Sequence, residues 1–216
     1  MPLEAVVFDF GETLVDETSI WGPWADWLGI PRLTFFGVLG GVIARGEDHS
    51  QVFEYIRPGF DRAAAREVRR AAGDIEQFTI DDFYPDAVPC LQTLKAAGLR
   101  LGIVGNQPTW AASTLQGLNL DVDMIGSSQS WGVSKPNPEF FARVCHELDL
   151  EPSAVSYVGD RIDNDVIPAA AAGMTAVFIK RGPWGYLQAG HLPLPEQAIA
   201  IESLEVLPQA LGLHRA

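Results

Sequence analysis

The segment AVVFDFGETLVD, residues 5–16, constrains the fold of this chain more than any other stretch of its sequence. Its short apolar opening is typical of a β-strand that is buried on both faces. Asp9 stands where that strand is expected to end, and Gly11 and Thr13 indicate a turn directly afterwards. In open α/β sheets, ligands bind at the carboxyl ends of the strands. Asp9 is therefore a candidate ligand-binding carboxylate, although a lone Asp after a strand more commonly caps a surface turn.

Strand and helix patterns alternate regularly from residue 86 onward. Expected strands cover residues 100–104, 122–127, 154–158, 175–179 and 197–201. Expected helices cover residues 86–97, 109–117, 138–148, 166–172 and 204–211. Alternation of this kind, with apolar strands, predicts an α/β fold in which helices cover both faces of a parallel sheet.

Residues 17–80 differ from the rest of the chain because they contain no convincing strand pattern. Apolar residues between positions 20 and 28 recur at helical spacing, and an apolar run follows at residues 33–44. That run is too short to span a bilayer and three glycines interrupt it, so it predicts a buried helix or a helix pair. We therefore expect an all-helical domain over residues 17–80, inserted into an α/β core domain formed by residues 1–16 and 81–216.

The overall composition argues against several classes of function. The chain has 216 residues, of which 47% are apolar, and its net charge of −13 argues against nucleic acid as a partner. Its two cysteines form no metal-binding or disulfide pattern, which fits a reducing compartment. The first residues carry no basic region or cleavage-like segment, so we expect no signal peptide, no membrane partner and a cytoplasmic protein. The sequence is compatible with a monomer or a homodimer.

Polar residues that can carry chemistry stand near the expected carboxyl ends of the strands. Asp9, Asn106 and Asp160 each follow an expected strand, Lys135 precedes an expected helix, and Asp165 comes shortly after Asp160. Because the strand ends of a parallel sheet share one edge, these side chains can converge. The carboxylates suit a hard cation, and Lys135 together with that cation suits an anionic group. The alternative for Asp160 is the N-cap of a helix.

Taken together, these motifs resemble those of the haloacid dehalogenase superfamily of hydrolases in their order and spacing. Residues 5–16 match the nucleophile motif, Lys135 and Pro136 match the lysine motif, and residues 159–165 match the acidic metal motif. The resemblance covers essentially the whole chain. It implies a Rossmann-like core with a parallel sheet, and it implies that the helical insertion is a cap domain.

The resemblance also implies a Mg²⁺-dependent hydrolase that acts on a small phosphorylated metabolite. In the family's pattern, Asp9 attacks phosphorus and forms an aspartyl-phosphate, which water then hydrolyses. Mg²⁺ is then expected on Asp9, Asp160 and the main-chain carbonyl of Gly11, with Asp165 in a supporting position.

The same resemblance implies how the substrate is held. Lys135 is expected to bridge the nucleophile and the phosphate. Asn106, its neighbour Gly105, and main-chain amides near Gly11 and Glu12 are expected to lie around the phosphate oxygens.

Two positions depart from the family's usual pattern. Family phosphatases usually carry a general acid/base Asp where this chain has Gly11, and loss of such a group costs about 10²–10⁴-fold in rate. Glu12, the next residue, is a candidate catalytic replacement, with a solvated turn residue as the alternative. Gly105 stands where the family has Ser or Thr. The two glycines leave a nearly inactive phospholigand-binding protein as the alternative function, whereas the acidic metal motif argues against a dehalogenase.

Overall fold

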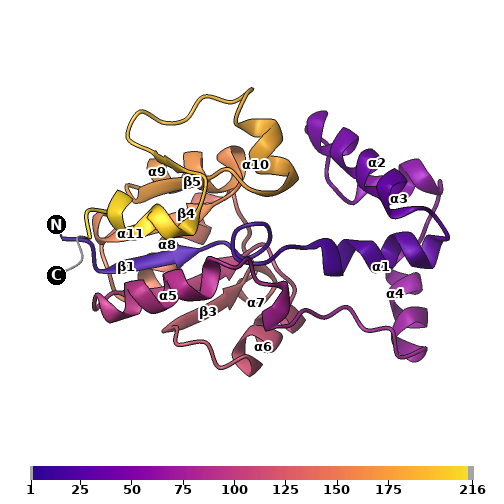
Figure 1. Cartoon of the computed structure of the whole chain (residues 1–216), viewed down its shortest axis with the longest axis horizontal. Helices are drawn as coiled ribbons and strands as arrows, with labels where there is room; N and C mark the ends of the chain where they lie inside the picture. The colour runs from indigo at the N-terminus through magenta and orange to yellow at the C-terminus, as the bar shows by residue number, and fades with distance from the viewer. Residues whose placement is uncertain (1, 214–216) are drawn as a thin grey trace. The chain divides into compact units, whose positions relative to one another are not determined.

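The computed structural model describes residues 2–213. Residue contacts separate two compact units, shown in Figure 1. The sheet unit comprises Met1–Asp16 and Thr79–Ala216, and the helical unit comprises Glu17–Phe78. The chain therefore leaves the sheet unit after Asp16 and re-enters it at Thr79.

Strands from both parts of the sheet unit form a single parallel sheet. Within residues 2–213 the sheet has six strands in the order β3-β2-β1-β4-β5-β6, and every neighbouring pair is parallel. The strands are β1 (Ala5–Phe8), β2 (Arg100–Gly105), β3 (Met124–Ser127), β4 (Val155–Gly159), β5 (Thr175–Ile179) and β6 (Ile199–Ile201). The predicted α/β fold class with a parallel sheet is thereby confirmed. β1 is apolar throughout because all its residues are fully buried in the middle of this sheet.

Short helices connect the strands of the sheet unit (Figure 1). The α-helices are α5 (Ala87–Ala96), α6 (Thr109–Gly117), α7 (Ser128–Trp131), α8 (Pro138–Leu148), α9 (Ile167–Ala171), α10 (Gly182–Gln188) and α11 (Leu207–Ala210). Single turns of other helix types are η1 (Ile80–Asp82), η2 (Pro152–Ala154), η4 (Leu204–Val206) and the π-helix η3 (Ile162–Val166). Buried residues of α8, η3 and α9 share one hydrophobic cluster with β1, β4 and β5. The α7 and α10 helices lie where the sequence indicated only loops.

The helical unit contains α1 (Thr18–Leu28), α2 (Arg32–Ala44), α3 (Gln51–Ile56) and α4 (Arg62–Ala71). Its interior is aromatic, with Trp24 fully buried and its ring centroid 5.1 Å from that of Phe53. The apolar run at residues 33–44 belongs to one helix, α2, and that helix is not wholly buried, since Leu33 is 87% exposed. No single helix in the described chain is long and apolar enough to cross a membrane. The α1 and α2 helices are long and apolar enough only when they are counted together, and that pair is bent by 115°.

Main-chain hydrogen bonds join the two segments where the chain leaves and re-enters the sheet unit. The N–H of Asp16 donates to the carbonyl of Asp82, and the N–H of Tyr84 donates to the carbonyl of Leu14, both at 2.9 Å. A short antiparallel bridge connects Val15 with Phe83 between them. The loop that follows β1 is therefore fixed against the segment before α5.

One carboxylate at the start of α5 joins three parts of the sheet unit. Asp86 Oδ2 pairs with the guanidinium of Arg181 at 2.5 Å, and it also accepts hydrogen bonds from the Ser203 hydroxyl and the Leu204 N–H, each at 2.9 Å. The side chains of Asp86 and Arg181 are only 11% and 10% exposed. Burial alone would raise the pKa of Asp86, but the hydrogen bonds from Arg181, Leu204 and Ser203 hold it below its ordinary value.

We predict that Asp86→Asn lowers the free energy of unfolding by about 1–3 kcal/mol at neutral pH, because Arg181 loses its charged partner in a nearly buried position. Denaturation by urea would measure this change. The matched control is Asp121→Asn, whose side chain is 81% exposed, and its effect is expected to stay under about 0.5 kcal/mol.

The effect of Asp86→Asn should also depend on pH. The native state holds the pKa of Asp86 below its unfolded value of about 3.9, so the charged carboxylate stabilises the fold above that pH. The contribution is lost as the pH falls through the lower, native pKa. The stability difference between wild type and Asp86→Asn should therefore shrink when urea denaturation is repeated at decreasing pH, and a constant difference would contradict this assignment.

Candidate active site

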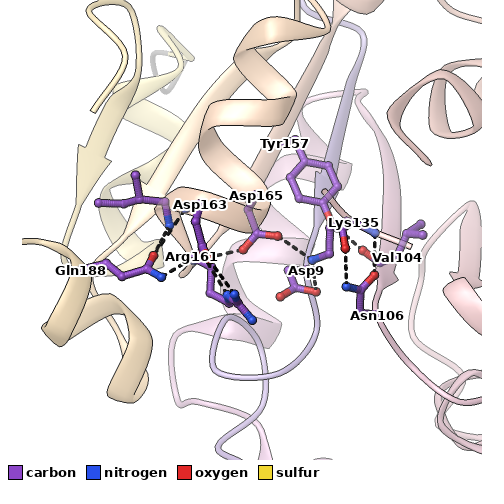
Figure 2. A network of polar contacts seen from close by, with 10 residues as sticks. Asp9, Val104, Asn106, Lys135, Tyr157, Arg161, Asp163, Asp165 and Gln188 are labelled. Carbon is purple, nitrogen blue, oxygen red and sulfur yellow. Dashed lines mark hydrogen bonds and ion pairs between the residues drawn. The ribbon is translucent and has the colours of Figure 1, made fainter. Parts of the chain in front are cut away.

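Residues singled out in the sequence gather at the carboxyl edge of the sheet, where Figure 2 shows Asp9, Asn106, Lys135 and Asp165 close together. Asp9 follows β1 directly and Asp160 follows β4, while Asn106 follows β2. β1 is paired with both neighbours, since Phe8 lies level with Ile103 of β2 and with Val158 of β4. The strand order reverses at β1, which is where ligands bind in open α/β sheets.

Lys135 lies between two carboxylates at the centre of this edge (Figure 2). Its Nζ atom is 2.8 Å from Asp9 Oδ1 and 2.5 Å from Asp165 Oδ1, and its side chain is 1% exposed. Nζ also lies 5.5 Å from the ring centroid of Tyr157, whose own hydroxyl donates to the Val104 carbonyl at 2.7 Å. Burial alone would lower the pKa of Lys135, but Asp165 and Asp9 outweigh it and hold the pKa well above its ordinary value. Lys135 is therefore a permanent positive charge in the site.

Asn106 holds the main chain of Lys135 from both sides (Figure 2). Asn106 Nδ2 donates to the Lys135 carbonyl at 2.9 Å, and Asn106 Oδ1 accepts from the Lys135 N–H at 2.8 Å. An amide nitrogen carries two N–H donors, so this pairing leaves one of them for another acceptor. The structure thus gives Asn106 a role in placing Lys135, beside the phosphate contact that the resemblance implies.

Three carboxylates are close enough together to share one cation. Asp9, Asp160 and Asp165 are buried, and each offers an oxygen within 4.8 Å of the others. Asp160 is 1% exposed, and its Oδ2 atom has no hydrogen-bond partner among the described residues. Burial raises the pKa of Asp160 well above its ordinary value, and the charges of Asp165, Asp9 and Glu12 raise it further. Uncompensated acids of this kind are the donor set that a hard divalent cation requires.

Two glycines at strand ends provide the space that these carboxylates occupy. A Cβ atom at Gly105 would overlap Asp9 Oδ1, and a Cβ atom at Gly159 would overlap the carboxyl group of Asp165. The strands on either side of β1 therefore end in residues without side chains. Gly105 is the position where the family has Ser or Thr, and with Asp9 in this position a side chain there would collide with it.

The loop after Asp9 places Glu12 inside the protein rather than in solvent. Glu12 adopts a left-handed backbone conformation, with φ of 56°, and it is 8% exposed. Its Oε2 atom accepts a hydrogen bond from the hydroxyl of Tyr84 at 2.7 Å. The turn is closed by the Glu12 N–H, which donates to the carbonyl of Val15 at 2.7 Å, and by a bridge between Gly11 and Val15. The charge of Glu12 is also one of the causes that raise the pKa of Asp160.

The segment that carries Asp165 is held by residues of its own turn and of α10 (Figure 2). The N–H of Arg161 donates to Asp165 Oδ2 at 3.0 Å, and the Arg161 guanidinium pairs with Asp163 at 2.7 Å. Gln188 accepts from the N–H of Ile162 at 2.7 Å and donates to Asp163 at 2.8 Å. Both oxygens of Asp165 are thereby engaged, one by Lys135 and one by the main chain.

Sequence reasoning missed three residues that support the site, namely Tyr84, Arg181 and Gln188. Arg181 follows an expected strand at the same edge of the sheet, so its position was a usable signal. Tyr84 and Gln188 had no such signal, because their roles depend on contacts between distant parts of the sequence. Tyr84 contacts a residue 72 positions away, and Gln188 contacts residues that are 25 and 26 positions away.

Comparisons with known proteins show which family the chain is similar to. The family model for haloacid dehalogenase-like hydrolases matches residues 3–173. A plasmid-encoded phosphoglycolate phosphatase of Cupriavidus necator is 30% identical over an alignment of 223 positions, which covers 98% of this chain and 94% of that protein. A glyceraldehyde 3-phosphate phosphatase of Methanopyrus kandleri is 36% identical over 104 residues, which cover 47% of this chain and 45% of that protein. The match thus spans less than half of the length of that second relative.

A solved structure shows the same likeness over the whole chain. The crystal structure of a HAD phosphatase from Thermococcus onnurineus superimposes with a TM-score of 0.63 at 26% identity, and the match covers 99% of this chain and 100% of that one. The family match and the nearly end-to-end relative from Cupriavidus necator confirm what the order of the motifs indicated: the chain belongs to the haloacid dehalogenase-like hydrolases.

Proposed function

We propose that this hydrolase is a Mg²⁺-dependent phosphatase of small phosphorylated metabolites and that Asp9 is its nucleophile. The observation that carries the proposal is the buried Lys135 ammonium, which pairs with Asp9 and Asp165 in the same cluster as Asp160, whose Oδ2 atom has no hydrogen-bond partner within residues 2–213. This arrangement combines a carboxylate nucleophile with positive charge for an anionic substrate. The names of the relatives from Cupriavidus necator and Methanopyrus kandleri support a phosphate ester as that substrate.

The residues at the sheet edge fit a divalent cation. Asp9 and Asp160 would hold Mg²⁺ together with the main-chain carbonyl of Gly11, and Asp165 would have a supporting role. The fit rests on the orphaned, buried Oδ2 atom of Asp160 and on the all-oxygen donor set. When bound, Mg²⁺ supplies charge that offsets the repulsion between an anionic nucleophile and an anionic phosphate.

The chain's own residues then carry out two displacements at phosphorus. A carboxylate oxygen of Asp9 forms a bond to phosphorus while the bond to the ester oxygen breaks, and the leaving oxygen takes the electron pair. Water then forms a bond to the same phosphorus, and the bond to Asp9 breaks to restore the carboxylate. Lys135 holds Asp9 in place and stabilises negative charge on the phosphoryl oxygens throughout.

Each displacement needs a proton transfer, and Gly11 cannot provide it. We assign this role to Glu12, which is buried in the loop after the nucleophile and whose charge raises the pKa of Asp160. Glu12 would give a proton to the leaving oxygen in the first displacement and would take one from water in the second. Its burial argues against the solvated turn residue that the sequence left open.

The direct test is turnover of a panel of phosphomonoesters that includes phosphoglycolate and glyceraldehyde 3-phosphate. With Mg²⁺ present, we expect phosphate release from at least one ester, and Asp9→Asn should lower kcat by about 10³-fold or more because it removes the nucleophile. Asp121→Asn, on the exposed surface, is the matched control and should keep full activity.

The outcome against the proposal is stabilisation of the protein by Mg²⁺ and phosphate esters without turnover of any of them. That result would favour the phospholigand-binding alternative. Thermal unfolding of each variant, measured in the same buffers, separates loss of chemistry from loss of fold.

A second prediction concerns the cation and does not depend on activity. Asp160→Asn should raise the stability of the metal-free protein by about 1 kcal/mol or more, because it removes a buried charge that has two like-charged neighbours. The same change should abolish the rise in Tm that Mg²⁺ causes in the wild type. Thermal unfolding with and without Mg²⁺, after treatment with a chelator, measures both effects. Equal Mg²⁺ stabilisation of wild type and Asp160→Asn would contradict the assigned site.

A further inference from the structure

The side chain of Glu12 is fixed by residues far from it in the sequence. The hydroxyl of Tyr84 donates to Glu12 Oε2 at 2.7 Å, across 72 positions of the chain. The ring of Tyr84 is covered by Arg181, whose guanidinium carbon lies 4.1 Å from the ring centroid. Arg181 is itself anchored, since it donates to the Thr13 carbonyl at 2.9 Å and pairs with Asp86. The Tyr84 hydroxyl is therefore held by a well-supported ring.

The start of α10 is shaped around the same side chain. Gly182 has φ of 61°, which favours glycine, and a Cβ atom there would come within 2.5 Å of Glu12 Cβ and Oε2. Glu12 is thus enclosed by Tyr84, in the loop between η1 and α5, and by the start of α10. A residue that only closed a turn would not need this accommodation.

The hydroxyl of Tyr84 is not needed to hold the backbone of the loop. Four other hydrogen bonds already do so. Within the loop, the N–H of Glu12 donates to the carbonyl of Val15, and the N–H of Leu14 donates to the carbonyl of Phe10. From outside the loop, the N–H of Tyr84 donates to the carbonyl of Leu14, and the guanidinium of Arg181 donates to the carbonyl of Thr13. The hydroxyl bonds to the carboxylate itself. Burial and the nearby charge of Glu12 also raise the pKa of Tyr84, so its hydroxyl keeps its proton as a donor.

We propose that Tyr84 is a positioning residue, which holds the Glu12 carboxylate in the orientation from which it exchanges protons during the reaction. This inference rests on the proposed phosphatase function and on the role assigned to Glu12. Arg181 and Gly182 complete the arrangement by fixing the ring and by leaving space for the carboxylate.

The test compares two esters that differ in how much they need a proton donor. p-Nitrophenolate leaves as a stable anion, whereas the alkoxide of glycerol 2-phosphate must be protonated as it leaves. Tyr84→Phe keeps the ring under Arg181 and removes only the hydroxyl. We expect it to lower kcat/KM for glycerol 2-phosphate roughly tenfold and kcat/KM for p-nitrophenyl phosphate much less, because only the first reaction depends on a correctly placed acid.

A double-mutant cycle shows whether Tyr84 acts through Glu12. Glu12→Gln removes the transferable proton, and we expect the same selective loss on glycerol 2-phosphate. Adding Tyr84→Phe to Glu12→Gln should cause no further loss, since the residue to be positioned no longer transfers a proton. Additive losses would overturn the proposal, because they would mean that Tyr84 supports the loop independently.

Tyr186→Phe is the matched control, because it removes a hydroxyl from an exposed tyrosine of α10 and keeps its ring. It should leave both rates unchanged. Two results with an active wild type would contradict the proposed role of Tyr84 while the phosphatase function stands. In the first, Tyr84→Phe lowers kcat/KM for both esters equally, and in the second it lowers kcat/KM for neither ester. If wild type and Asp9→Asn hydrolyse these two esters and every ester of the phosphomonoester panel equally slowly, the phosphatase function fails and the role of Tyr84 fails with it. Thermal unfolding confirms that each variant is folded.

Discussion

A single buried ammonium group makes the rest of this site possible. Lys135 is almost inaccessible to water, yet it lies against Asp9 and Asp165 with Asp160 nearby. Burying one charge without a partner is strongly unfavourable, and so is burying several carboxylates side by side. The ammonium and the carboxylates tolerate burial because they face each other. Since the carboxylates outnumber the ammonium, the cluster still has an excess of negative charge, and this excess is what makes it suited to a cation.

The backbone is arranged to allow these charges to meet. The sheet order reverses at β1, so the ends of β2 and β4 flank Asp9. Both flanking strands end in glycine, at Gly105 and Gly159, and each glycine leaves room for a carboxyl group. Side chains at these positions would displace Asp9 or Asp165 from Lys135. Glycine at residue 105, where the family has Ser or Thr, therefore does more than remove one hydrogen-bonding hydroxyl. It also leaves the space that the Asp9 carboxylate occupies.

Much of the fold and the charged centre could be predicted from the sequence, because both follow from local patterns. Apolar strands that alternate with helices indicate a parallel sheet, and a parallel sheet brings its strand ends together, which located Asp9, Asp160 and Asn106. The short helices α7 and α10 were missed because they contain few residues and little periodicity. The partners of Asn106 could not be predicted either, since a side-chain amide can pair with any nearby main chain, and the sequence does not say that Lys135 lies there.

Glu12 shows why the position of a charged residue along the chain does not fix where its side chain lies. Moving a carboxylate from residue 11 to residue 12 would ordinarily turn the side chain away, because neighbouring residues point in different directions. Here the left-handed backbone of Glu12, the space at Gly182 and the hydroxyl of Tyr84 together keep its carboxylate inside the protein. Two of these three conditions come from segments far away in the sequence. Under the proposed function, a carboxylate one position out of register serves the same site because the surrounding fold holds it in place.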